Sequence, residues 1–215
     1  MARLRNTMIF ICSSKNTETA RNSPPEKIMS QIQIAVVVGS LRADSINKKL
    51  ADALVKLAPA EFTFKHIEIG NLPLYNQDQD PSPPEVVTKF KAEISSAQGV
   101  IFVTPEYNRS IPGVLKNALD QGSRPYGQSA WAGKPAGVLG ASIGTIGTAV
   151  AQQHLRTMLA YLDMPTLGQP EVYLFVKDDF FTPDGDLANE GTKKFLQGWM
   201  DKYVAWVKFH PTASS

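Results

Sequence analysis

The chain has 215 residues, of which 43% are hydrophobic and 20% charged, a composition typical of one globular domain with a substantial core. Its formal net charge of +2 is too small to indicate a nucleic-acid-binding surface or a polybasic membrane surface. The single cysteine, Cys12, excludes an intrachain disulfide and a cysteine-ligated cluster, and it is typical of a protein in a reducing compartment, which predicts a cytoplasmic location.

Residues 1–30 are predicted to lie outside the folded domain. The apolar run at 8–12 is far too short for a membrane span or a secretory signal, and a polar run with Pro24 and Pro25 follows it. We interpret this segment as a disordered or extended tail, and a targeting peptide that includes Arg3 and Arg5 is the alternative. The folded domain is expected over 31–209, with a short C-terminal tail over 210–215.

From residue 31 onward, apolar runs of strand length alternate with runs of helical spacing. Strands are predicted at 32–38, 62–69, 100–103, 135–141 and 171–176, and helices at 46–57, 85–97, 111–121, 150–162 and 190–208. Pro112 suits the first turn of the third helix, where no backbone N–H is required. Five β–α units in this order indicate a doubly wound parallel sheet. Periodicity alone does not distinguish a five-stranded flavodoxin-like sheet from a six-stranded Rossmann sheet.

Loop one, residues 39–47, follows the first strand and has the composition of a phosphate site. Ser40, Ser45 and Asn47 offer hydroxyl and amide donors, and Arg42 offers a planar fork that matches phosphate oxygens. The start of the following helix adds backbone N–H groups and a favourable dipole. Serine and asparagine are also ordinary helix caps, which is the alternative interpretation. A Walker motif and the G-x-G-x-x-G dinucleotide motif are both absent here.

Loop two, Thr104-Pro-Glu-Tyr-Asn-Arg-Ser110, follows the third strand at the same expected edge of the sheet. Pro105 shapes the turn and leaves the following backbone amides free to contact a flat ligand, beside which Tyr107 and Asn108 can lie. Loop three, residues 140–148, follows the fourth strand, and its glycines allow the main chain to approach a ligand closely. A glycine-rich entry to the next helix is the plainer interpretation of loop three.

The stretch from Val103 to Ser123 resembles the signature of the NADPH-dependent FMN reductase family, and loop one resembles that family's G-S-L-R-x-x-S-x-N phosphate loop. The resemblance implies a flavodoxin-like three-layer α/β sandwich with strand order 2-1-3-4-5. It also implies FMN as a tightly bound cofactor and NADPH or NADH as electron donor. No catalytic side chain and no metal ligand is expected, because the flavin carries the chemistry. The candidate cofactor-binding residues are Ser40, Arg42, Ser45, Ile46, Asn47, Pro105, Glu106, Tyr107, Asn108, Ser142 and Gly144.

The implied activity is ping-pong hydride transfer from NAD(P)H to a quinone or another oxidised small molecule, such as chromate or an azo compound. A flavodoxin-like electron carrier without turnover is the main alternative, although such carriers are strongly acidic. A dehydrogenase that uses NAD without flavin is the second alternative. The resemblance further implies a homodimer or homotetramer in which residues 72–76 close a neighbour's site and the helix after loop three lies at a subunit contact. Nucleic acid and membranes are not expected partners.

Four further side chains are assigned secondary roles. Glu106 is predicted to be a solvated or interface-pairing carboxylate, because an anion facing the ring would oppose its reduction. Arg109 and Arg124 are expected to flank the cleft, where they could attract an anionic acceptor or the phosphate of NADPH. Trp131 is expected in packing, with a place at the mouth of the pocket.

Overall fold

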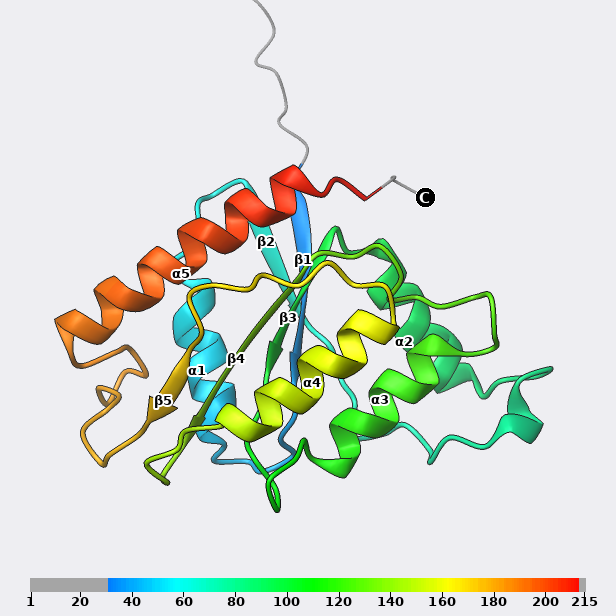
Figure 1. The fold of residues 1–215 in the computed structure, drawn as a ribbon, viewed down its shortest axis with the longest axis horizontal. Coiled ribbons are helices and arrows are strands. Elements are labelled where there is room, and N and C mark those ends of the chain that lie inside the picture. Colours follow the sequence, from blue (N-terminus) through cyan, green and yellow to red (C-terminus); the bar gives the residue numbers. More distant parts are fainter. Residues whose placement is uncertain (1–30, 213–215) are drawn as a thin grey trace, which may run out of the picture.

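The computed structural model describes residues 31–212, and the predicted tail at 1–30 lies outside the described residues. These residues form a parallel sheet covered by helices on both faces (Figure 1). The strands are β1 (Ile32–Val38), β2 (Phe62–His66), β3 (Gly99–Val103), β4 (Ala136–Ser142) and β5 (Tyr173–Phe175), in the spatial order β2-β1-β3-β4-β5. All four strand pairs are parallel. The predicted flavodoxin-like order is therefore confirmed, and the six-stranded Rossmann alternative is wrong.

The helices are α1 (Ile46–Val55), α2 (Glu85–Ser96), α3 (Gly113–Ser123), α4 (Ala149–Tyr161) and α5 (Glu190–Phe209), with a short 3-10 turn at Gln77–Gln79. Successive side chains of a strand point to opposite faces of the sheet, so the buried strands contribute side chains to two separate hydrophobic cores. Ala35, Val37 and Phe102 pack under α2, α3 and α4, whereas Ile34, Val36 and Ile101 pack under α1 and α5. This two-sided burial explains why β3 is apolar at every position.

Helix α5 packs closely on the sheet because Gly137 has no side chain. The rings of Trp199 and Tyr203 stack with their planes 7° apart and their centroids 5.3 Å apart. A Cβ atom at Gly137 would lie 2.7 Å from the Trp199 ring, so only glycine fits beneath this pair. Both aromatic side chains are almost completely buried.

Three expected features are shorter or shifted in the structure. β2 ends at His66 rather than at residue 69, because the chain leaves the sheet once Ile67 has donated to the Val36 carbonyl at 2.9 Å. β5 spans only Tyr173–Phe175 at the sheet edge, where β4 is its one partner. Pro112 is the residue before α3 rather than part of its first turn.

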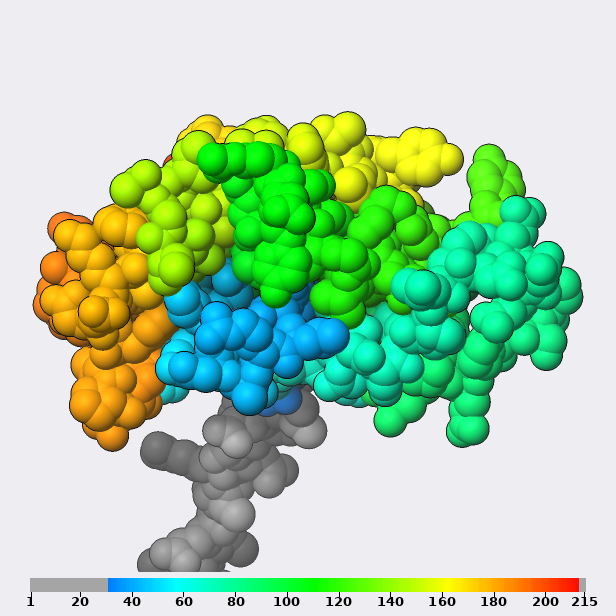
Figure 2. All heavy atoms as spheres, turned by 90° about the horizontal axis from the view of Figure 1, so that it is seen from below, coloured from blue at the N-terminus to red at the C-terminus, as the bar shows by residue number. Residues whose placement is uncertain are grey.

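The carboxyl ends of β1, β3 and β4 lie at one edge of the sheet, the lower edge in Figure 1. β1 and β3 are adjacent, and the connections from them lead to opposite faces of the sheet. This arrangement is a topological switch point, where open α/β sheets bind their ligands. Figure 2 views this edge directly, with loop one in blue, loop two in green and loop three in yellow-green close together.

Candidate functional site

Loop one runs from the end of β1 to the start of α1. The Gly39 N–H donates to the Val103 carbonyl at 2.9 Å, so the loop leaves the sheet directly beside β3. Ser45 caps α1, and its hydroxyl oxygen accepts from the Lys48 N–H at 3.3 Å. The hydroxyl hydrogen of Ser45 remains free to donate, because the cap uses only the oxygen as acceptor. Arg42 makes no ion pair with any residue between 31 and 212.

Asn47 has a different partner from the predicted phosphate. Its side-chain N–H donates to the Ala141 carbonyl at 2.9 Å, and its side-chain oxygen accepts from the Ala141 N–H at 2.9 Å. The side chain is buried, and these two bonds join α1 to β4. Sequence reasoning could not find this contact, because the two residues are 94 positions apart. The Asn47 amide therefore positions loop one against loop three.

Loop two forms a tight two-residue hairpin. Tyr107 and Ser110 exchange backbone hydrogen bonds of 2.9 and 3.0 Å, and the two central residues, Asn108 and Arg109, have φ values of 50° and 64°. Two positive φ angles define a type I′ turn, which is uncommon without glycine. Strained backbone of this kind concentrates at ligand-binding loops. The turn leaves the Tyr107 ring half exposed at the molecular surface.

The solvated environment predicted for Glu106 is wrong. Its carboxylate is only 7% exposed, and one oxygen accepts from the Ala151 N–H at 3.0 Å in the first turn of α4. The other oxygen pairs with the Arg109 guanidinium at 3.1 Å. A carboxylate at this place stabilises the positive end of the helix dipole. A second contact, 3.1 Å between His154 and the Ser110 hydroxyl, also holds loop two against α4.

Loop three approaches loop two through Gly140. A Cβ atom at this position would lie 2.2 Å from the Thr104 carbonyl oxygen, so a larger residue would push the two loops apart. The Ser142 hydroxyl accepts from the Gly144 N–H at 3.0 Å and shapes the turn that follows β4. Ile143 lies within this turn, between Ser142 and Gly144, with 76% of its surface exposed.

The three loops enclose one cavity that brings most of the predicted residues together. All loop-one candidates line it, with the candidates Pro105, Glu106, Tyr107 and Ser142. Asn108 and Gly144 line an adjoining cavity that shares Glu106 and Ser142 with the first. Two lining residues, Ala141 and Ile143, were not predicted, because neither carries a polar group that a motif search would notice.

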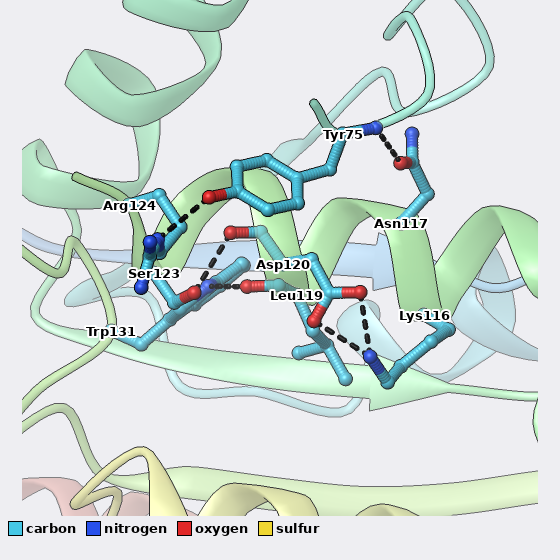
Figure 3. Close-up of polar contacts among 8 residues, drawn as sticks. All are labelled: Tyr75, Lys116, Asn117, Leu119, Asp120, Ser123, Arg124 and Trp131. Atoms are coloured by element: carbon cyan, nitrogen blue, oxygen red, sulfur yellow. Dashed lines mark hydrogen bonds and ion pairs between the residues drawn. The ribbon is translucent and has the colours of Figure 1, made fainter. Parts of the chain in front are cut away.

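Arg124 and Trp131 lie outside this cavity, which corrects their predicted places. The Arg124 guanidinium donates to the Tyr75 hydroxyl at 2.8 Å (Figure 3). The same guanidinium pairs with Asp80 at 3.3 Å. The pKa of Arg124 lies above its usual value, chiefly because of the Tyr75 hydrogen bond. Trp131 is fully buried, and its indole N–H donates to the Leu119 carbonyl at 3.0 Å. Both residues therefore stabilise the region around α3 and do not line the cavity at the three loops.

The segment at 72–76 is held against α3 in the same region. The Tyr75 N–H donates to the Asn117 side-chain oxygen at 2.8 Å, as Figure 3 shows. The Asn117 side-chain N–H donates in turn to the Pro73 carbonyl at 2.9 Å. Leu74, between these anchors, is 82% exposed. The segment is thus fixed by its backbone while presenting an apolar side chain at the surface.

The cavity at the three loops suits a nucleotide with one phosphate and a flat ring system. Arg42 and the hydroxyls of Ser40 and Ser45 provide donors next to the start of α1, where an anion is favoured. The carboxylate of the cavity, Glu106, is already paired and does not oppose an anion strongly. Tyr107 and Ile143 offer exposed apolar surface on the other side, where a ring could cover it. The residues present therefore fit FMN.

The fold and this cavity define a flavodoxin-like nucleotide-binding protein. Residues 32–177 match the family model for NADPH-dependent FMN reductase, and the chain belongs to that family. A 2-hydroxy-1,4-benzoquinone reductase from Burkholderia sp is 56% identical over 177 residues, which are 82% of this chain and 97% of the relative. A quinone reductase from Pseudomonas putida is 51% identical over 184 residues, which are 85% of this chain and 98% of that relative.

A solved structure agrees with these sequence relatives. The flavoenzyme FerB, an NAD(P)H:(acceptor) oxidoreductase from Paracoccus denitrificans, is 44% identical, with a TM-score of 0.81 over 84% of this chain and all of that one. The protein is accordingly an oxidoreductase that uses FMN and NAD(P)H, as predicted. No helix between residues 31 and 212 is long and apolar enough to cross a membrane.

Proposed function

We propose that this protein reduces quinones with electrons from NAD(P)H at a single FMN-binding cavity formed by loops one, two and three. The observation that carries the proposal is the cavity at the β1–β3 switch point. It has phosphate donors that residues 31–212 leave unpaired, together with the exposed side chains of Tyr107 and Ile143. Quinone reduction is the activity named for the relatives that are 56% and 51% identical.

Loop one holds the FMN phosphate in this proposal. Arg42 supplies a charge-assisted contact, and the Ser40 and Ser45 hydroxyls supply neutral ones. The dipole and free N–H groups at the start of α1 add to the same attraction. Asn47 contributes indirectly to FMN binding, since its hydrogen bonds to Ala141 fix the distance between loop one and loop three.

Loops two and three hold the flavin ring. Backbone groups around Pro105, Tyr107 and Gly144 contact its edge, and the tie between Glu106 and α4 keeps loop two in register with loop three. Bound FMN supplies the redox chemistry, since it can accept a hydride from a nicotinamide and release it to a quinone. The chain itself positions the ring, excludes water from its inner face and leaves the outer face open. No side chain of the cavity is assigned a proton-transfer role.

An open ring face admits several classes of electron acceptor, so we propose chromate and azo compounds as acceptors in addition to quinones. The proposed assembly is a homodimer or homotetramer, in which the exposed Leu74 of one subunit closes a neighbour's cavity. Subunit contact at α4 is supported by Tyr161, a large side chain that is 86% exposed near the end of that helix. A cytoplasmic location is proposed from the single cysteine.

An acceptor profile tests the proposed activity. The purified protein is supplied with NADPH, and consumption is measured with 1,4-benzoquinone, chromate, an azo dye and the one-electron acceptor ferricyanide. The proposal expects quinones to give the highest kcat/KM among these acceptors. If no quinone supported NADPH consumption, the proposed activity would be contradicted and the electron-carrier alternative would be favoured.

Arg42→Ala tests the assignment of the phosphate site. Loss of a charge-assisted hydrogen bond costs about 1.5–3 kcal/mol, so FMN affinity should fall by about 10-fold to 100-fold. The Kd is measured by adding FMN to the FMN-free protein and following flavin fluorescence. Lys89→Ala on α2, which also removes an exposed cation, is the matched control and should leave the Kd unchanged. An unaltered Kd in Arg42→Ala would show that loop one does not bind the phosphate.

A further inference from the structure

Arg109 has a backbone conformation that is unfavourable for a residue with a side chain. It is the second central residue of the loop-two hairpin, with a φ of 64°, and Asn108 before it has a φ of 50°. Asparagine tolerates the left-handed region, and glycine is the residue that a type I′ turn prefers at the second position. Strained residues of this kind concentrate at functional sites. Because glycine would form the same turn at lower cost, the turn itself does not require the Arg109 side chain.

The ion pair with Glu106 occupies only part of the Arg109 guanidinium. Its Nη1 group contacts one Glu106 oxygen at 3.1 Å, whereas Nε and Nη2 donate no hydrogen bond to any residue between 31 and 212. The Glu106 side chain is 7% exposed, and its other oxygen is held by the Ala151 N–H at the start of α4. The Arg109 side chain is 67% exposed. A ligand that approaches loop two therefore meets the cation, because the anion behind it is buried and lies at the positive end of a helix dipole.

Arg109 lies at the cavity that adjoins the flavin cavity. Loops two and three border this adjoining cavity, and Figure 2 shows them side by side in green and yellow-green. Glu106 and Arg109 are the only ionisable residues that line it, and Ile146 adds a partly exposed apolar side chain. The N–H groups of Thr145 and Ile146 have no hydrogen-bond partner among residues 31–212. A cation beside apolar surface and free donors suits a flat aromatic ligand that carries an anionic group.

The two cations at this edge of the sheet belong to different cavities. Arg42 lines the flavin cavity and not the adjoining one, whereas Arg109 lines the adjoining cavity and not the flavin cavity. FMN has one phosphate, which the proposed function assigns to Arg42 and loop one. Arg109 therefore remains available for the molecule that exchanges electrons with the flavin.

We propose that Arg109 is a specificity-determining residue that favours quinones with an anionic substituent over neutral quinones. The proposal rests on the proposed function and adds to it the class of quinone that this site prefers. The planar guanidinium binds the anionic group, and the quinone ring covers the apolar surface that Ile146 provides.

Arg109→Gly in the full-length, FMN-loaded protein tests this assignment. The value of kcat/KM is measured for 1,4-naphthoquinone-2-sulfonate and for neutral 1,4-naphthoquinone, with NADPH as donor, and the two values are expressed as a ratio. The intrinsic reactivity of each quinone is the same for every variant, so a change in this ratio reports recognition of the anionic group. A binding measurement accompanies it, in which the Kd of the sulfonated quinone for the oxidised protein is obtained from the change in flavin absorbance without any donor.

Two other variants serve as controls. Arg109→Lys keeps the charge at the same place and should retain the preference for the sulfonated quinone. Lys116 on α3 is also an exposed cation paired with a carboxylate, that of Asp120, and it lines neither cavity. Lys116→Gln should therefore leave the ratio unchanged. The urea midpoint of each variant is measured as well, and Arg109→Gly should remain folded because glycine suits the turn.

The expected result for Arg109→Gly is a fall of about 10-fold in the ratio and a rise of about 10-fold in the Kd of the sulfonated quinone, as for loss of one charge-assisted contact. An unchanged ratio in Arg109→Gly would overturn the assignment. A lower kcat/KM for NADPH without any change in the ratio would also overturn it, because the cation would then serve the donor. In both cases the unmodified protein would still reduce the two quinones, whereas failure of the proposed function would leave both unreduced.

Discussion

Asn47→Ala tests how the cavity is held together. Successive residues of a strand direct their backbone groups to alternate sides, and at the end of β4 one of those sides has no strand. The Gly140 N–H donates towards β5, to the Val172 carbonyl, and the Ser142 carbonyl accepts from Val176 on the same side. The N–H and carbonyl of Ala141 therefore point the other way, where β3 has already ended. The Asn47 side chain takes the place of the missing strand.

The expected loss of stability follows from the backbone N–H and carbonyl of Ala141, which Asn47→Ala would leave without a partner. Each buried backbone group without a hydrogen bond costs about 1–3 kcal/mol, so Asn47→Ala should lower the free energy of unfolding by about 2–6 kcal/mol. That loss is a large part of the roughly 5–15 kcal/mol by which a domain is stable. The measurement is urea unfolding of the FMN-free protein, followed by tryptophan fluorescence and by circular dichroism.

Asn76→Ala is the matched control for Asn47→Ala. The Asn76 side-chain oxygen accepts from the Asp78 N–H at 3.1 Å, but this bond is exposed, so its loss should cost about 1 kcal/mol at most. If Asn47 acted mainly as a phosphate donor, Asn47→Ala would weaken FMN binding and leave the FMN-free protein as stable as before. A change in unfolding free energy below about 0.5 kcal/mol, the range of ordinary surface substitutions, would refute the reasoning.

Two further substitutions test single features of the structure. The Tyr203 hydroxyl is buried without a hydrogen-bond partner among the described residues, and burial raises the pKa of this phenol well above its usual value. Tyr203→Phe should therefore keep or increase the unfolding free energy, by up to about 1–2 kcal/mol, and a clear loss of stability in thermal or urea unfolding would contradict this. Glu106→Gln keeps an acceptor for the Ala151 N–H but removes the charge that stabilises α4, so it should cost about 1 kcal/mol in urea unfolding. No measurable cost would show that the carboxylate charge does not contribute there.

The sequence predicted the parts of the site that depend on local chemistry. Loop one, loop two and loop three each follow an apolar run, so their place at the ends of three parallel strands could be inferred from the pattern alone. Ser45 was recognisable as a phosphate donor or as a helix cap, and in the structure its hydroxyl oxygen caps α1. The strand order could not be inferred from periodicity, since it depends on which strands pair, and the resemblance to a known family provided it.

The parts that were missed depend on contacts between distant residues. Glu106 is buried only because the start of α4 lies beside loop two, and the two are 45 positions apart in the chain. Trp131 was expected in packing, and it packs beside Phe90 and Phe102, but nothing around it in the sequence indicated that it lies away from the mouth of the cavity. Arg124 looked like a free cation because its partner Tyr75 lies 49 positions earlier.

The most direct test of the account is an anaerobic spectral titration of the purified protein. An FMN-loaded reductase should be a yellow protein with flavin absorbance at about 450 nm that NADPH bleaches and that one equivalent of 1,4-benzoquinone restores. A colourless protein that still oxidises NADPH would contradict the presence of a flavin site. A yellow protein that neither NADPH nor NADH can bleach would contradict its function as a reductase.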